Sequence, residues 1–247
     1  MFEPACVACR QVLPTPLRRA ICDSCWHSIE TNQVAEPRCR ICGDELAIAS
    51  AGADNCERCS LTPPAYSFAR SAGRFEGSLR EVIHAFKFEG RRLLAEPLGS
   101  LLLVAGSDVL TDTDAVVPVP LHPLRSFTRG FNQADDLARQ LKLPIWRVLR
   151  RSRHGPPQAS LPARQRRRHL TGHFGTGLRS HVRVWFGRPN TISGARLVLI
   201  DDVMTTGATL DACARVLRDA GAADVRALTV ARAVTARLSR PLAPPRP

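Results

Sequence analysis

The sequence predicts an α/β protein whose mainly parallel sheet is preceded by a small cysteine-rich module. Two observations support this fold class. Eight of the nine cysteines stand as four C-x-x-C pairs within the first 59 residues, and short apolar runs alternate with helical patterns from about Ala65 onward. We therefore expect a cysteine-rich module over residues 1–62, an α/β domain over residues 65–235 and a disordered proline- and arginine-rich tail over residues 236–247.

Length and composition are those of an ordinary folded protein. The chain has 247 residues, of which 44% are apolar and 23% charged, which is enough to bury a sizeable core. No apolar run approaches the roughly 20 residues that a membrane-spanning helix needs. The first residues, "MFEPACVACR", lack the basic and apolar regions of a secretory signal. We expect a cytoplasmic protein without a membrane-spanning segment.

The cysteine pairs predict two structural zinc ions. A C-x-x-C pair directs two thiolates toward one point, and two pairs complete a tetrahedral shell with no open position. A disulfide framework is the main alternative, but a chain without a secretory signal is expected to be reduced. The pairs can join in sequence or interleave, and the near-identical spacing of the two halves favours two sequential zinc ribbons. The expected ligands are Cys6, Cys9, Cys22 and Cys25 for one ion, and Cys39, Cys42, Cys56 and Cys59 for the other.

Two other features complete this part of the sequence. The segment "SLTPPAYSFAR" after Cys59 indicates a linker, because Pro63 and Pro64 stiffen it. The ninth cysteine, Cys213, lies three residues before Val216 in a helical pattern and is expected to be a small core residue.

The elements of the α/β domain follow in order from hydrophobic periodicity. "GSLREVIHAFKF" predicts a helix with Leu79, Val82, Ile83 and Phe86 on one face. A second helix follows over 95–106, then a short buried strand over 114–121 and a helix over 133–143. The remaining elements are a strand over 196–202, a helix over 209–221 and a last strand over 225–233. Strands interleaved with helices indicate βαβ units, which bind ligands at the carboxyl ends of the strands.

The segment "VLIDDVMTTGATL", residues 198–210, has the chemistry of a sugar-phosphate site. Backbone N–H groups and threonine hydroxyls at a helix N-terminus suit a monophosphate, and Gly207 permits close approach of the backbone. Ionised carboxylates only accept hydrogen bonds, so Asp201 and Asp202 suit sugar hydroxyls instead. A ribose 5-phosphate meets both demands, with its phosphate on the loop from Thr205 through Thr206, Gly207 and Ala208 to Thr209.

This segment resembles the phosphoribosyl pyrophosphate signature of type I phosphoribosyltransferases, in which an apolar strand and two acids precede T-T-G-x-T. Further motifs, "FEGSLREVIHAFKFEGRR" and "VPVPLHPLRSFTRGFNQADDLA", together with the paired cysteines, resemble the ComF family, which is tied to competence and the use of incoming DNA. The resemblance runs from Cys6 to about Ala233, and "RGFNQ" is its most specific motif. It implies a type I phosphoribosyltransferase sheet behind a double zinc ribbon.

The resemblance also implies roles for individual residues. The loop "PVPLHPLRSFTRGFNQ" would hold the pyrophosphate through Arg125 and Arg129, whose forked donors suit phosphate oxygens, and His122 is a weaker candidate. Lys87 matches a family position from which it can reach the pyrophosphate, although a lysine on a helix face is more often only solvated. A mobile hood would comprise Gln158, Leu161, Arg164, Arg168 and Phe174. Here His169 and Pro162 depart from the family pattern, and residues 175–194 have no assigned role.

Any catalysis implied by the family is displacement at the anomeric carbon, with pyrophosphate as the leaving group. Mg²⁺ would neutralise the pyrophosphate and be held mainly by ligand and water, while Asp201 and Asp202 would stabilise the cationic ribosyl group. The sequence contains no recognisable base-binding residue, so the acceptor is open. The alternative is a non-catalytic interaction factor whose pocket is a ligand sensor or a relic.

The charge distribution predicts an anionic macromolecular partner. The net charge is +13, and residues 137–200 contain 14 arginines and lysines without a single acid. Such a stretch favours polyanions, so we expect binding of single-stranded DNA. The second ribbon instead carries Asp44, Glu45, Asp54 and Glu57, which favours contact with proteins such as competence or recombination factors.

Overall fold

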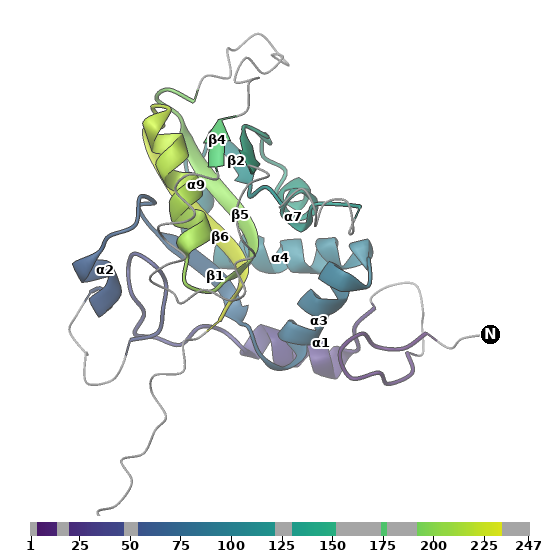
Figure 1. Ribbon diagram of the computed structural model, residues 1–247. Coiled ribbons are helices and arrows are strands. Elements are labelled where there is room, and N and C mark those ends of the chain that lie inside the picture. Colours follow the sequence, from purple (N-terminus) through teal and green to yellow (C-terminus); the bar gives the residue numbers. More distant parts are fainter. Residues whose placement is uncertain are drawn as a thin grey trace, which may run out of the picture.

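A computed structural model describes residues 4–13, 20–46, 54–121, 130–151, 174–176 and 192–233. Its centre is a four-stranded sheet in the order β1-β6-β5-β2, in which every neighbouring pair is parallel (Figure 1). The strands are β1 (Ala69–Arg74), β2 (Ala115–Pro118), β5 (Arg196–Met204) and β6 (Asp224–Arg232). This arrangement confirms the predicted α/β class with a parallel sheet.

Helices cover both faces of the sheet. One face carries α3 (Gly77–Phe88), α4 (Ala95–Ala105) and α7 (Gln133–Gln140), and the other carries α9 (Ala208–Asp219) (Figure 1). Shorter helices are η2 (Arg92–Leu94) and α5 (Ser107–Leu110). The alternation of side chains along β5 divides the core accordingly. Leu197 and Leu199 lie in the cluster with α9, and Val198 and Ile200 lie in the cluster with the other helices.

The predicted helices and the later strands are present, with two differences from expectation. Strand β5 continues to Met204, two residues beyond its predicted end, so Asp201 and Asp202 lie within the part of the strand that pairs with β6. Strand β1 was not predicted. The buried positions of its sequence "ARSAGR" hold only small residues, so the sequence lacks the alternation of large apolar and polar residues that indicates a strand. The described residues also include an antiparallel pair, β3 (Leu149–Arg151) with β4 (Phe174–Thr176).

The two zinc ribbons lie on opposite faces of the sheet. The first ribbon contains α1 (Asp23–Thr31), and its residues Cys6 and Ile29 are buried in the cluster with α3. The second contains α2 (Glu57–Leu61), and its Cys42 and Cys59 are buried in the cluster with α9. The chain therefore passes from one face to the other around the outer side of β1.

Backbone hydrogen bonds attach the ribbons to that strand. The Ala69 N–H donates to the Ile41 carbonyl at 2.7 Å, and the Arg74 N–H donates to the Asn32 carbonyl at 3.0 Å. The side-chain amide of Asn32 donates to the Arg74 carbonyl at 3.0 Å. Both ends of β1 are thus paired with the cysteine-rich module.

The segment expected to be a linker is fixed to helix α9. The Ala65 N–H donates to Asp211 Oδ1 at 2.8 Å, and Arg218 Nε donates to the Ala65 carbonyl at 3.3 Å. Tyr66, the next residue, is almost fully buried among residues of the second ribbon and α9. The tail over 236–247 lies outside the described residues, and none of the described helices has the length and apolar character needed to cross a bilayer.

Candidate functional site

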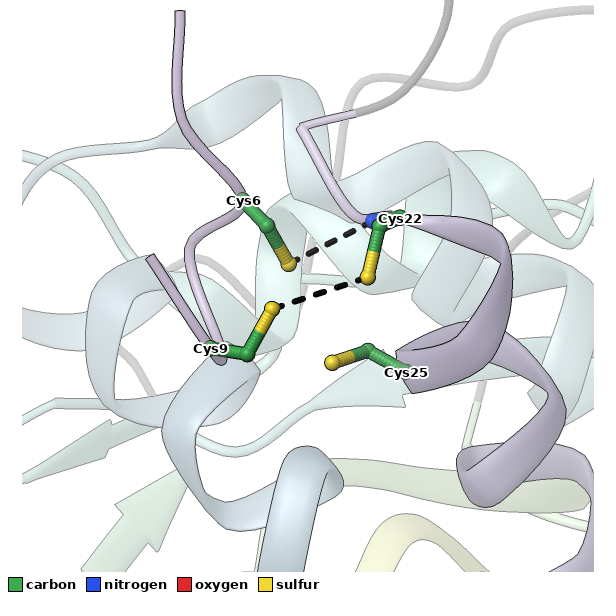
Figure 2. Close-up of side chains that lie close together, drawn as sticks. All are labelled: Cys6, Cys9, Cys22 and Cys25. Carbon is green, nitrogen blue, oxygen red and sulfur yellow. Dashed lines mark hydrogen bonds between the residues drawn. The ribbon is translucent and has the colours of Figure 1, made fainter. Parts of the chain in front are cut away.

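The first four cysteines form one thiol cluster. Cys6 and Cys9 come from a turn, Cys22 and Cys25 from the start of α1, and the four sulfurs point toward one another (Figure 2). All four lie within 4.8 Å of each other, and the Cys9 and Cys22 sulfurs are 3.6 Å apart. A tetrahedral zinc site with Zn–S bonds of about 2.3 Å places its sulfurs about 3.8 Å apart. The cluster therefore fits a zinc ion.

The next four cysteines, Cys39, Cys42, Cys56 and Cys59, form a second cluster of the same size, with the Cys42 and Cys56 sulfurs 3.7 Å apart. Sequential pairing is thus confirmed, and interleaving is excluded. The sulfurs accept hydrogen bonds as thiolates do: the Cys22 N–H donates to Cys6 Sγ at 3.3 Å. A hydrogen bond with Ser24 lowers the pKa of Cys22 to about 6, whereas burial raises the pKa of Cys25 to about 12.

The two acids lie at the carboxyl end of β5, in the middle of the sheet. Asp202 continues the row of Val198 and Ile200 toward α3, and it is 9% exposed. There it forms an ion pair with Lys87 from the last turn of α3, with Nζ and Oδ1 2.7 Å apart. The structure thus brings these two predicted residues together. The ion pair shows no contact between Lys87 and a ligand. The Asp202 N–H donates to Asp201 Oδ1 at 2.9 Å, which orders the acid pair.

The threonine loop leads directly into helix α9. Gly207 is its N-cap with φ of 72°, a left-handed conformation that favours glycine. A Cβ atom at Gly207 would lie 2.7 Å from Met204 Cε and 3.0 Å from the Tyr66 hydroxyl. The Thr206 hydroxyl accepts from the Ala208 N–H at 3.4 Å, while Thr205 is exposed and Thr209 is half-buried. The loop thus exposes hydroxyls at the N-terminus of a 12-residue helix.

Two arginines that the sequence reasoning missed connect this loop to the second ribbon. Arg58 donates from Nη1 to the Thr206 carbonyl at 2.8 Å. Arg232, at the end of β6, is fully buried and binds Asp44 through two contacts of 2.9 Å. Its Nη1 also lies 3.0 Å from the Met204 sulfur. An arginine in the apolar strand "VRALTVARA" was a visible signal for a buried ion pair, whereas nothing in the sequence distinguished Arg58 from a surface charge.

The motif "RGFNQ" positions the start of α7. The Phe131 ring lies 5.9 Å from that of Phe86 in α3. Asn132 caps α7 by accepting from the Ala134 N–H at 3.1 Å, and it donates to the Val119 carbonyl just after β2. Arg125, Arg129 and His122, together with the hood residues Gln158, Leu161, Arg164 and Arg168, lie outside the described residues, and only the backbone of Phe174 is described.

Comparison with known proteins agrees with this architecture. The double zinc ribbon domain family matches residues 1–60, and the phosphoribosyl transferase domain family matches residues 127–244. Competence protein F of Haemophilus influenzae is 30% identical over 242 residues, covering 94% of this chain and 98% of that protein. The chain belongs to the ComF family. Its relatives include the DNA utilization protein YhgH of Escherichia coli strain K12, 30% identical over 90% of this chain and 93% of that one.

A third ComF-family relative, competence protein ComFC of Bacillus subtilis, is 33% identical over 66% of this chain and 63% of its own length. Among solved structures, a glutamine phosphoribosylpyrophosphate amidotransferase from B. subtilis matches 55% of this chain and 25% of that one, with 20% identity and a TM-score of 0.34.

Arginines of the acid-free stretch, residues 137–200, form ion pairs with acids that precede the stretch in the sequence. Arg139 and Arg147 both form ion pairs with Asp135. Burial raises the pKa of Asp135, but hydrogen bonds from the two arginines outweigh it and leave the pKa below its ordinary value. Arg196 approaches Asp114 at 3.8 Å. Arg139, Arg147 and Arg196, which lie in the described part of the stretch, are therefore partly neutralised.

Proposed function

We propose that this ComF-family protein binds phosphoribosyl pyrophosphate or a ribose 5-phosphate at the carboxyl edge of its sheet. The 5-phosphate lies on the loop from Thr205 to Thr209, and the ribose hydroxyls lie on Asp201 and Asp202. One observation carries the proposal. The acid pair at the end of β5 and the glycine-capped start of α9 are only a few residues apart, so acceptors for hydroxyls stand beside donors for an anion.

Lys87 keeps this site electrostatically balanced. Its ammonium forms an ion pair with Asp202 beside the sugar subsite, and the proposal assigns its remaining N–H donors to the pyrophosphate. Arg125 and Arg129 complete that subsite as forked phosphate donors. Mg²⁺, when bound to the ligand, neutralises pyrophosphate charge.

The chemistry that this arrangement serves is displacement of pyrophosphate at the anomeric carbon. Asp201 and Asp202 stabilise the cationic ribosyl group through the sugar hydroxyls, because a carboxylate gains attraction as positive charge develops. The acceptor is left open by the proposal. A non-catalytic ligand sensor would use the same contacts without turnover.

Calorimetry with ribose 5-phosphate, and with phosphoribosyl pyrophosphate and Mg²⁺, tests the proposal. Asp202→Ala removes hydroxyl acceptors and is expected to weaken sugar-phosphate binding by about 1.5–3 kcal/mol, while inorganic phosphate binds as well as before or better. Asp219→Ala, the same change at the exposed far end of α9, is the matched control and should leave binding unchanged. If the wild-type protein fails to bind either ligand at millimolar concentration, the proposal is wrong.

We further propose that the protein acts on single-stranded DNA in competence or DNA utilization, in the cytoplasm, where a reducing environment keeps its thiolates free to bind zinc. The names of its relatives and the acid-free stretch support this role. In this view a zinc-ribbon module over residues 1–62 and a phosphoribosyltransferase-like domain over residues 65–235 act together, with competence or recombination proteins as further partners.

Salt-dependent DNA binding tests this second part. Each phosphate contact adds about 0.7 to the slope of log affinity against log salt for single strands. Replacing residues 166–168, three consecutive arginines, by glutamine should therefore lower the slope by about 2. A control triple variant at the exposed Arg40, Arg80 and Arg91 should keep the wild-type slope. Equal slopes for the wild type and the first variant would exclude this stretch as the DNA-binding surface.

A further inference from the structure

Arg58 of the second ribbon contacts the centre of the threonine loop. It lies in α2, between the cluster residues Cys56 and Cys59, and its side chain is half-buried. Its Nη1 donates to the Thr206 carbonyl at 2.8 Å, across 148 positions of sequence. The hydrogen bond fixes the direction of a carbonyl in a loop whose N–H groups would receive an anion.

The orientation of that carbonyl sets the orientation of the next N–H. In a trans peptide the C=O and the N–H of the same unit point in opposite directions. With the Thr206 oxygen held toward Arg58, the Gly207 N–H points away from the second ribbon. A rotation of this peptide would instead present an oxygen to the phosphate, which repels it. Arg58 therefore selects the loop conformation that can bind an anion.

The other side of Gly207 is bounded by Met204 of β5 and by Tyr66, from the segment that follows the second ribbon. Met204 Cε and the Tyr66 hydroxyl leave no room for a Cβ atom at this position. The Met204 sulfur lies 3.0 Å from Arg232, which donates to the Cys42 carbonyl at 2.6 Å. The loop is thus held between one arginine of the ribbon and a second arginine buried against it.

We propose that Arg58 is a positioning residue for phosphate binding, which acts by orienting the Thr206–Gly207 peptide. The proposal rests on the proposed function of the loop. It also makes the second ribbon part of the ligand site, because the two cysteines that flank Arg58 belong to its metal cluster. The cluster fits zinc, and a loaded cluster would keep α2 and Arg58 in place.

The test compares two arginines of the same ribbon. Arg58→Gln removes the charged donor to Thr206, whereas Arg40→Gln removes an equal charge from a side chain that is 75% exposed and pairs with the exposed Asp54. Calorimetry with ribose 5-phosphate and with inorganic phosphate should show a roughly tenfold loss of affinity for both ligands in Arg58→Gln. Arg40→Gln should bind both as the wild type does, and Arg58→Lys should recover part of the affinity.

An amide signal distinguishes positioning from general support of the fold. Phosphate binding should shift the Gly207 amide proton downfield in the wild type and in Arg40→Gln, because this N–H then donates to an anion. The shift should be absent or strongly reduced in Arg58→Gln, with zinc content and melting temperature unchanged. A tenfold loss accompanied by loss of zinc would assign Arg58 to the fold and overturn the proposal.

Failure of this inference can be told from failure of the proposed function. If the wild type binds ribose 5-phosphate and Arg58→Gln binds it as tightly as Arg40→Gln, the positioning role is wrong while the ligand site remains. If the wild type does not bind the ligand, the proposed function itself fails. When Arg58→Gln is combined with Thr206→Val, the loss of binding free energy should be smaller than the sum of the two single losses. When Arg58→Gln is combined with Asp202→Ala, the loss should equal that sum.

Discussion

Gly207 begins helix α9 in a left-handed conformation with two side chains against its α-carbon, so its replacement by alanine perturbs the loop in two separate ways. The backbone penalty for a residue with a Cβ atom in this conformation is about 1–2 kcal/mol. The added methyl would also lie 2.7 Å from Met204 Cε. Methionine usually moves easily, but the sulfur of this one is held by buried Arg232, so we add about 1 kcal/mol for overpacking.

Urea denaturation of Gly207→Ala should therefore show a loss of about 2–3 kcal/mol in the free energy of unfolding. Gly194→Ala is the matched control, since Gly194 has a similar φ of 77° and no atom within 4 Å of the added carbon. Gly194→Ala should lose only the part of the unfolding free energy that comes from the backbone conformation, and its ligand affinity should be unchanged. Gly207→Ala should lose ligand affinity as well. Equal losses in the two variants would refute the argument that Met204 and Tyr66 restrict the loop.

Three further outcomes are expected. Cys22→Ser and Cys39→Ser should each lower zinc content from about two ions to about one per chain, measured by metal analysis of reduced protein; unchanged content would contradict separate four-thiolate sites. Burial raises the pKa of Asp224, but hydrogen bonds, chiefly from Arg226, lower it more. The stabilisation from this ionised carboxylate is therefore present above about pH 4 and is lost as the pH falls. In Asp224→Asn, the free energy of unfolding should consequently decrease less steeply as the pH is lowered below about 4. Arg232→Met leaves Asp44 without its partner and should cost about 3–5 kcal/mol in urea denaturation; a loss below 1 kcal/mol would refute this.

The grouping of the cysteines and the position of the acids and the threonine loop could be predicted from the sequence because both depend on neighbouring residues. The zinc clusters follow from cysteine spacing, and the loop from residues 201–209 follows from one short segment at the end of an apolar strand. The pairing of Lys87 with Asp202 joins two predicted residues, but their contact needed the packing of α3 on the sheet. Periodicity identifies the inner face of a helix and does not specify its partner.

The contributions of Arg58 and Arg232 could not be predicted because they depend on which face of the sheet the second ribbon covers. That choice is made by contacts between segments far apart in sequence, such as Cys42 with Arg232. Strand β1 escaped prediction for a related reason. Its inward residues are Ala69, Ser71 and Gly73, and small side chains are buried here because neighbouring backbones approach closely, not because the residues are strongly apolar.

The passage of the cysteine-rich module around β1 has a consequence for how the protein avoids self-association. β1 is the outermost strand of its sheet, and an outer strand with free N–H and C=O groups is a template for pairing with another molecule. At the two ends of β1, backbone N–H groups donate hydrogen bonds to the carbonyl groups of Ile41 and Asn32. A truncated chain lacking the module is therefore expected to form strand-paired oligomers even if its remaining core still folds. Chelation of zinc would loosen the segments that contain Asn32 and Ile41. The full-length protein should then form strand-paired oligomers as well.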